Sequence, residues 1–211
     1  MSTRHWWQGW DPGESGACLL LDPNGDAVVL WTWRTRKKDG LTVYQVAILQ
    51  GDKARDETVE TLHDVGVLIR DGTARVTGCQ TWGVCSENTF MHNSIRTTLS
   101  IARTQGKIIG PSERHAVRRE ILFVQPDKWR KEHLPHDYKN LVQPVEVPAG
   151  KLPKPGHFAK AASLHFIPRR LSPLALWLPR ASEILGVRVT KLDHCTDAGG
   201  VALYGAKHGE T

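Results

Sequence analysis

The sequence lacks paired cysteines and long apolar runs. Its 211 residues hold four cysteines, none of them at CxxC spacing, which argues against a zinc site or a disulfide framework and favours reduced thiols in a cytosol. The N-terminal segment MSTRHWWQGWD has no apolar stretch that fits a signal peptide or a membrane span. We therefore expect a cytoplasmic protein without a membrane partner.

Internal repeats and glycine-rich phosphate loops are also missing. The segment most similar to such a loop is TDAGG at 196–200, and it matches a phosphate-binding loop poorly. This disfavours an ATPase of the sugar-kinase type. The length fits one domain, 1–211, with a sizeable core. The formal net charge of +6 favours a polyanionic partner such as nucleic acid.

Turn residues and apolar periodicity predict an α/β fold. Asp-Pro-Gly at 11–13 and Asp-Pro-Asn-Gly-Asp at 22–26 separate three short strands of an antiparallel meander. The predicted strands cover 5–11, 16–22, 27–35, 79–87 and 119–125, the last of them buried, and 41–50 is either a further strand or an extended excursion. The predicted helices cover 56–70, about 94–108, 126–134, 172–185 with a kink or break at Pro179, and a last one from about Asp193. Residues 135–170 are rich in Pro, Lys, Arg and His and predict a long surface excursion. Together these elements predict a mixed sheet flanked by helices.

Four potential metal ligands occur at the ends of these elements. Asp11 and Glu87 each end a predicted strand, and His194 and Asp197 share one face of the last helix. Three carboxylates and one imidazole in one crevice require a cation, and hard oxygen ligands favour Mg²⁺ or Mn²⁺. Two such ions per site can hydrolyse a phosphodiester bond.

Each of the four also has an ordinary interpretation. Asp11 can be a turn residue, and Glu87 a solvated charge at a strand end. Asp193 can be a helix N-cap, and His194 and Asp197 can be first-turn residues that the helix dipole favours. The occurrence of all four in one order makes the site hypothesis the stronger one.

Three segments resemble the RuvC-type Holliday junction resolvases of the ribonuclease H-like superfamily. The family's first carboxylate lies in a DPG turn, as Asp11-Pro12-Gly13 does here. Its second lies in E-x-x-F-M-x-x-N; ENTFMHNS from Glu87 has the same Glu, Phe and Met, with Asn93 one position earlier than in the pattern and Ser94 at the last position. Its last two precede a helix of small residues, as in HCTDAGGVALYGA from His194. The segment RTQGKI at 103–108 is similar to the middle of the family's dimer helix.

This resemblance implies a homodimer that binds a four-way DNA junction and nicks two opposing strands symmetrically, in a bacterial cell or a virus-infected host. It makes Asp11, Glu87, His194 and Asp197 the catalytic and metal-binding residues. In such enzymes the Phe after the second carboxylate contacts bases near the crossover. The candidate DNA-binding residues are Phe90, Asn93, Arg96, Arg103, Lys107, Arg118, Arg119, Lys128, Arg130 and Lys131.

The chain departs from the common pattern at three places. His194 replaces the commoner Asp, and could be a metal ligand or a proton-transfer group. As a ligand it should lose its metal below about pH 6–6.5, where an unperturbed imidazole is protonated. Gly199 and Gly200 weaken the start of the last helix, and 36–55 and 135–170 are longer than the family core. A nuclease for other branched DNA or structured RNA, and a binding module without catalysis, remain alternatives.

Overall fold

The structure is a computed structural model of the chain. It describes residues 6–13, 15–38, 41–51, 82–88, 95, 98–99, 101–103, 105–106 and 121–209. The predicted helix at 56–70 lies outside these residues.

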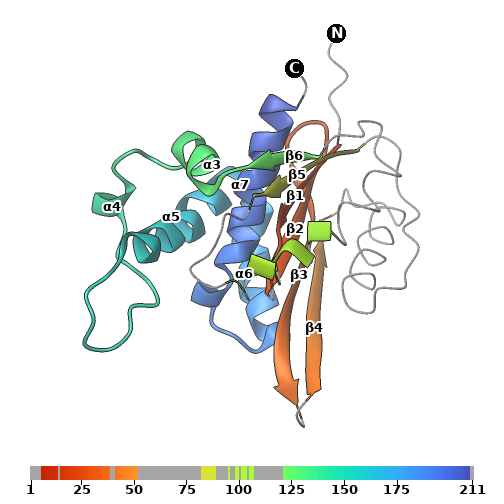
Figure 1. Ribbon diagram of the computed structural model, residues 1–211. Helices are drawn as coiled ribbons and strands as arrows, with labels where there is room; N and C mark the ends of the chain where they lie inside the picture. The colour runs from red at the N-terminus through yellow and green to blue at the C-terminus, as the bar shows by residue number, and fades with distance from the viewer. Residues whose placement is uncertain are drawn as a thin grey trace.

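A six-stranded sheet forms the centre of the fold, in the order β4-β3-β2-β1-β5-β6. Its strands are β1 (Trp6–Asp11), β2 (Gly16–Leu21), β3 (Ala27–Lys38), β4 (Leu41–Gln50), β5 (Trp82–Glu87) and β6 (Leu122–Val124). The first four strands pair antiparallel, whereas β5 pairs parallel with both β1 and β6. The predicted mixed sheet and its antiparallel meander are confirmed (Figure 1).

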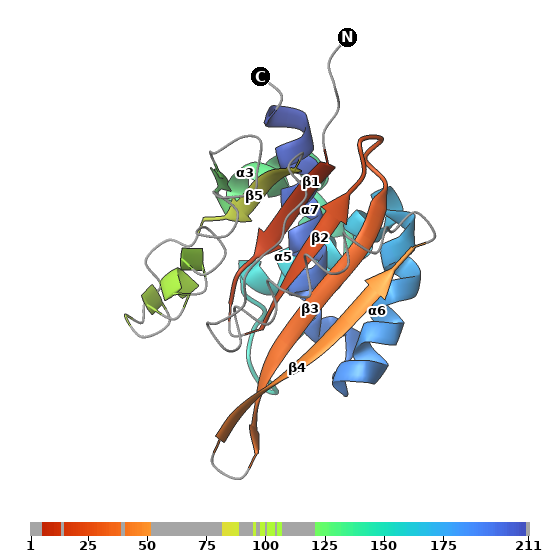
Figure 2. The same ribbon diagram turned by 90° about the vertical axis from the view of Figure 1, so that its right-hand side faces the viewer.

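The helices cover one face of this sheet (Figure 1). They are α3 (Pro126–His133), α4 (Tyr138–Leu141), α5 (Pro155–Arg170), α6 (Ser172–Leu185) and α7 (Asp193–His208), with a 3-10 turn η1 (Val189–Lys191) before α7. Figure 2 shows β3 and β4 crossing in front of α6 when the molecule is turned. Among the described residues, every helix is too short or too polar to span a lipid bilayer.

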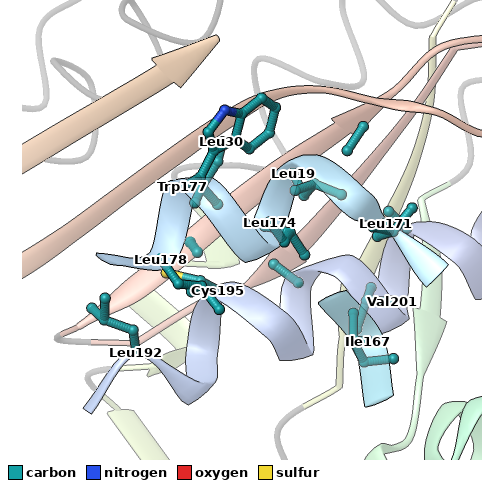
Figure 3. Packing of buried hydrophobic residues seen from close by; sticks show 14 of the residues in the cluster. Leu19, Leu30, Ile167, Leu171, Leu174, Trp177, Leu178, Leu192, Cys195 and Val201 are labelled. Atoms are coloured by element: carbon teal, nitrogen blue, oxygen red, sulfur yellow. The ribbon is translucent and has the colours of Figure 1, made fainter. Parts of the chain in front are cut away.

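Two apolar clusters form the core, one on each face of the sheet. Between sheet and helices, the buried side chains of Leu19 and Leu30 pack with Leu174 of α6 and Val201 of α7 (Figure 3). On the other face, three tryptophan rings lie together, Trp31 and Trp33 with centroids 4.5 Å apart and Trp10 with its centroid 5.9 Å from Trp31. These three buried rings fill the core on this face of the sheet.

Gly9 lets α7 lie unusually close to the central strand. A Cβ atom on Gly9 would lie 2.2 Å from the carbonyl oxygen of Ala198 and 2.3 Å from the backbone nitrogen of Ala202. No side chain fits in that space, so β1 and α7 are in backbone contact. This approach positions the start of α7 at the end of the sheet where β1 ends.

The prediction of an irregular excursion at 135–170 is wrong for its second half. Residues 155–170 form α5, a helix of 16 residues that packs on α7. Its buried face consists largely of small residues, including Ala159, Ala162 and Ser163. Small residues give a weak apolar periodicity, so the Lys- and His-rich composition concealed the helix. Pro155 at the first helical turn was the available signal.

Other elements differ in their bounds. β3 runs to Lys38, three residues beyond the predicted strand, because β4 pairs with it from Val29 to Lys38. α6 continues through Pro179 without a break, from Ser172 to Leu185. β6 covers only 122–124 and leaves Phe123 42% exposed, so the predicted buried strand at 119–125 is shorter and less buried than expected.

Candidate active site

Two neighbouring parallel strands place carboxylates side by side. In β1 and β5, Trp10 lies opposite Ser86, so the next residues, Asp11 and Glu87, are the last of their strands at the same edge of the sheet. Glu87 is buried and Asp11 partly buried. The parallel pairing, which sequence periodicity alone does not reveal, accounts for this convergence.

The first turn of α7 adds two more acidic side chains at that edge. Asp193 opens the helix and Asp197 follows one turn later, which puts both on one side of α7. Asp197 is 5% exposed. The charges of Asp193 and Asp197 both act on the pKa of Asp11 and of Glu87, so the four carboxylates form one electrostatic cluster. We call these four the acidic cluster.

Helix α3 contributes two side chains that hold this cluster. The indole Nε1 of Trp129 donates to Oε2 of Glu87 at 2.9 Å. The neighbouring Arg130 donates through Nη2 to Oδ2 of Asp197, also at 2.9 Å. Trp129 is fully buried, and the guanidinium of Arg130 lies 5.1 Å from its ring centroid. One short helix therefore fixes the orientation of carboxylates from both β5 and α7.

Helix α5 contributes the other partners of the cluster. The buried hydroxyl of Ser163 donates to Oδ1 of Asp197 at 2.5 Å, so both carboxylate oxygens of Asp197 are engaged. Lys160, one turn earlier, forms an ion pair with Asp193 at 2.7 Å. The segment predicted as a surface excursion thus supports the site directly.

Burial and mutual repulsion raise the pKa of three of these carboxyl groups. Burial is the largest cause for Glu87, and with the negative charge of Asp197 it raises its pKa to about 7, although Arg130 and Trp129 oppose the shift. The pKa of Asp11 is raised well above its usual range by burial and by Glu87 and Asp197. Burial also raises the pKa of Asp197, against the lowering effect of Arg130. The cluster has more negative charge than its two basic partners neutralise.

His194 lies on the sheet side of α7, with its Nε2 3.0 Å from the hydroxyl of Thr32 in β3. That hydroxyl donates its single proton to the carbonyl of Gly16 at 3.0 Å, so its oxygen accepts from Nε2–H. Nδ1 is then the unprotonated nitrogen of the ring. Burial lowers the pKa of His194 to about 4, so the ring stays neutral well below the pH 6–6.5 limit expected from the sequence.

In the described part of the chain, no three His, Cys, Asp or Glu side chains are arranged closely enough to hold a metal ion. The chemistry of the acidic cluster nevertheless fits a divalent cation. Hard carboxylate oxygens from three elements act electrostatically on one another, and a cation would relieve the repulsion that adds to the effect of burial on their pKa values. The positive charge of Arg130 neutralises part of the negative charge of the cluster through its hydrogen bond to Asp197.

A cavity of about 590 Å³ opens beside Arg130, between α3, α4 and the start of α5. Lys131 and Tyr138 line it together with Arg130. Arg130 therefore lies between the acidic cluster and this cavity, whose lining also includes Asp127.

The predicted DNA-binding residues fall into two groups. Arg103, Lys128 and Lys131 are exposed, as phosphate contacts require, whereas Arg130 is engaged with Asp197. The others lie outside the described residues: Phe90, Asn93, Arg96, Lys107, Arg118 and Arg119. Of the predicted dimer helix, the described side chains of Ile95 and Leu99 are 79% and 53% exposed.

Sequence reasoning missed several residues at this site, namely Thr32, Trp129, Lys160, Ser163 and the contribution of Asp193. Arg130 and Asp197 are 67 positions apart in the chain, and no local pattern connects such partners. The one available signal was the position of Asp193 directly before His194 on the same helical turn.

Comparisons with known proteins give a fold-level likeness only. No family model matches the chain, and no curated protein matches it. RuvC from Thermus thermophilus in complex with a Holliday junction substrate is 13% identical, with 98% of this chain and 95% of that chain covered and a TM-score of 0.43. A second Thermus thermophilus RuvC structure is 14% identical, with 97% and 96% covered and a TM-score of 0.36.

Proposed function

We propose that the protein is a metal-dependent nuclease that nicks four-way DNA junctions. The observation that supports this proposal best is the acidic cluster itself. Buried or partly buried carboxylates from β1, β5 and α7 share one edge of the sheet, and burial together with the neighbouring carboxylates raises their pKa values. Such an arrangement costs stability and is typical of a site built for a cation.

Asp11, Glu87 and Asp197 supply the oxygen ligands in this proposal, and Nδ1 of His194 supplies a nitrogen. Bound Mg²⁺ or Mn²⁺, two ions per site, supplies an activated water and stabilises the leaving 3′ oxygen. The imidazole makes Mn²⁺ somewhat more favourable than it is for an all-oxygen site.

The remaining side chains position these groups. Trp129 orients Glu87, and Ser163 and Arg130 orient Asp197. Thr32 accepts a hydrogen bond from Nε2–H of His194, which leaves Nδ1 as the nitrogen with a free lone pair. None of these roles requires the side chain to touch DNA, and each keeps a potential ligand in one rotamer.

The proposed specificity for junctions rests on the three sequence motifs and on exposed basic residues. The segments around Asp11, Glu87 and His194 occur in the order found in RuvC-type resolvases. Exposed Arg103, Lys128 and Lys131 provide cations for phosphates. A homodimer presents two sites with two-fold symmetry, which suits symmetric nicking of a junction.

The test is incubation with a synthetic four-way junction and Mg²⁺ or Mn²⁺, with an EDTA control and a linear duplex of the same sequence. We expect paired nicks in opposing strands of the junction only. The variants Asp11→Asn, Glu87→Gln and Asp197→Asn should each abolish nicking and keep junction binding, because they remove ligands and add no bulk.

Other outcomes support other functions. Nicks in flaps, forks or structured RNA but not in the junction indicate a different nuclease substrate. ATP turnover indicates a kinase-like enzyme. Binding without nicks under every metal condition indicates a module without catalysis and overturns the proposal.

A further inference from the structure

We infer that the β3–β4 hairpin is an arm that contacts the phosphate backbone of a DNA duplex leaving the acidic cluster. This inference rests on the proposed function and adds an interaction surface to it. The outer part of the hairpin, 34–38 paired with 41–45, is here called the ribbon.

The strand register shows that the ribbon extends beyond the sheet. β2 pairs with β3 only as far as Trp33, which lies opposite Gly16, whereas β4 pairs with β3 up to Lys38. Five residues of β3 therefore continue as a two-stranded ribbon, a reach of about 17 Å at about 3.3 Å per residue. In Figure 1 the hairpin of β3 and β4 projects past the helices.

The ribbon projects from the edge that carries the acidic cluster. β3 runs antiparallel to β2, and β2 antiparallel to β1, so β3 and β1 point the same way. Their C-terminal ends therefore lie at one edge, together with the end of β5. A duplex that leaves the cluster along this edge runs beside the ribbon.

Side-chain alternation puts a cationic row on the helix-facing side of the ribbon. Thr32 contacts His194 of α7, so side chains two, four and six positions later in β3 continue on that face. These are Arg34, Arg36 and Lys38, of which Arg36 and Lys38 are exposed and Arg34 is partly buried. The row begins next to the proposed site and leads away from it.

Charge complementarity identifies the partner. The sequence from 34 to 45 contains four basic residues and one acidic residue, Asp39. A two-stranded ribbon has the width that a DNA groove admits, and Arg and Lys are the usual phosphate contacts. At about 3.4 Å per base pair, a reach of about 17 Å corresponds to about five base pairs of duplex.

The test compares two charge-matched double variants in junction binding with EDTA present. Arg36→Glu with Lys38→Glu changes the ribbon, and Arg169→Glu with Arg180→Glu changes exposed residues of α5 and α6. Loss of two phosphate contacts should weaken binding about tenfold or more near physiological salt, and should reduce the slope of log K against log salt by about 1.8. The control pair should change binding by less than about threefold.

Equal loss in both pairs indicates a net-charge effect, and loss in neither shows that the ribbon does not touch DNA; both results overturn the inference. If the Glu pair unfolds, Arg36→Gln with Lys38→Gln decides, with an expected loss of about fivefold and wild-type thermal unfolding. A wild-type protein that binds junctions without nicking them overturns the proposed function and leaves the ribbon test valid. One that binds no DNA overturns both.

Discussion

At the scale of single residues, Arg130 has two opposing effects on the site. Its bond to Asp197 neutralises part of the acidic cluster in the absence of metal. The same positive charge repels an incoming divalent cation. Arg130 therefore stabilises the metal-free protein and should weaken metal binding.

Arg130→Gln should bind Mn²⁺ about tenfold more tightly, which corresponds to about 1.4 kcal/mol, and should have a lower unfolding temperature in EDTA. Calorimetric titration and thermal unfolding measure the two effects. Lys131→Gln, an exposed neighbour on the same helix, is the matched control and should change neither. Weaker Mn²⁺ binding by Arg130→Gln would show that orienting Asp197 matters more than charge.

Glu87 should make the metal-free protein less stable as the pH rises. Its pKa is about 7 in the folded protein, raised mainly by burial from 4.5. Between these two pH values the folded protein holds a proton on Glu87 that the unfolded protein has lost. The contribution of this proton to the free energy of unfolding is therefore complete below about pH 4.5 and is lost as the pH rises through 7.

In EDTA, the unfolding temperature of the wild type should fall between about pH 5 and pH 8 relative to that of Glu87→Gln, whose side chain does not titrate. Saturating Mn²⁺ should remove most of this difference at pH 8, because the cation replaces the proton. Parallel curves for the two proteins in EDTA would contradict the raised pKa.

At the scale of elements, the contact between α3 and α7 decides whether the cluster assembles. A Cβ on Gly200 would lie 2.4 Å from two ring carbons of Trp129. A Cβ on the adjacent Gly199 would meet only aliphatic side-chain ends at 3.0 to 3.3 Å, those of Ile167, Leu171 and Leu174. The two glycines weaken the helix equally and differ in what they contact.

Gly200→Ala should therefore displace the Trp129 indole, weaken its bond to Glu87 and lower the free energy of unfolding by about 1–3 kcal/mol, the usual cost of overpacking. Gly199→Ala gains up to about 1 kcal/mol in helix propensity and should be close to neutral. Urea unfolding followed by tryptophan fluorescence measures both. Equal destabilisation of the two variants would mean that helix packing in general, and not the α3 contact, sets the limit.

Elements with strong local signals could be predicted from the sequence, and those without them could not. The Pro-Gly and Asn-Gly turns and the apolar strands between them predicted β1 to β3, and Pro126 predicted the start of α3. α5 was missed because its buried face consists of alanine and serine. The approach of Asp11 and Glu87 was predicted from their positions at strand ends, but their partners on α3 and α5 come from tertiary packing.

At the scale of the whole molecule, the exposed apolar side chains of Ile95 and Leu99 bear on the predicted homodimer. A helix that packed on its own sheet would bury them. Leu99→Glu should therefore leave the protein folded and separate the subunits, because it puts an unpaired charge in the interface.

Sedimentation of Leu99→Glu beside the wild type measures this effect, and Lys128→Glu, a charge change at an exposed position of α3, is its control. A dimeric Leu99→Glu protein would exclude this helix from the interface. We expect the separated monomer to make one nick in a junction and to lose the ability to make two opposing nicks.

The acidic cluster combines the first described strand with the last described helix. During synthesis the ribosome releases β1 and β5 long before α7, so the nascent chain carries Asp11 and Glu87 without Asp193, His194 or Asp197. Under the proposed function, a chain that ends before α7 cannot cut DNA. This holds for a chain that is still being synthesised and for one made from a truncated transcript. Cells that express residues 1–190 should accordingly show no more DNA damage than cells that express the Asp197→Asn protein.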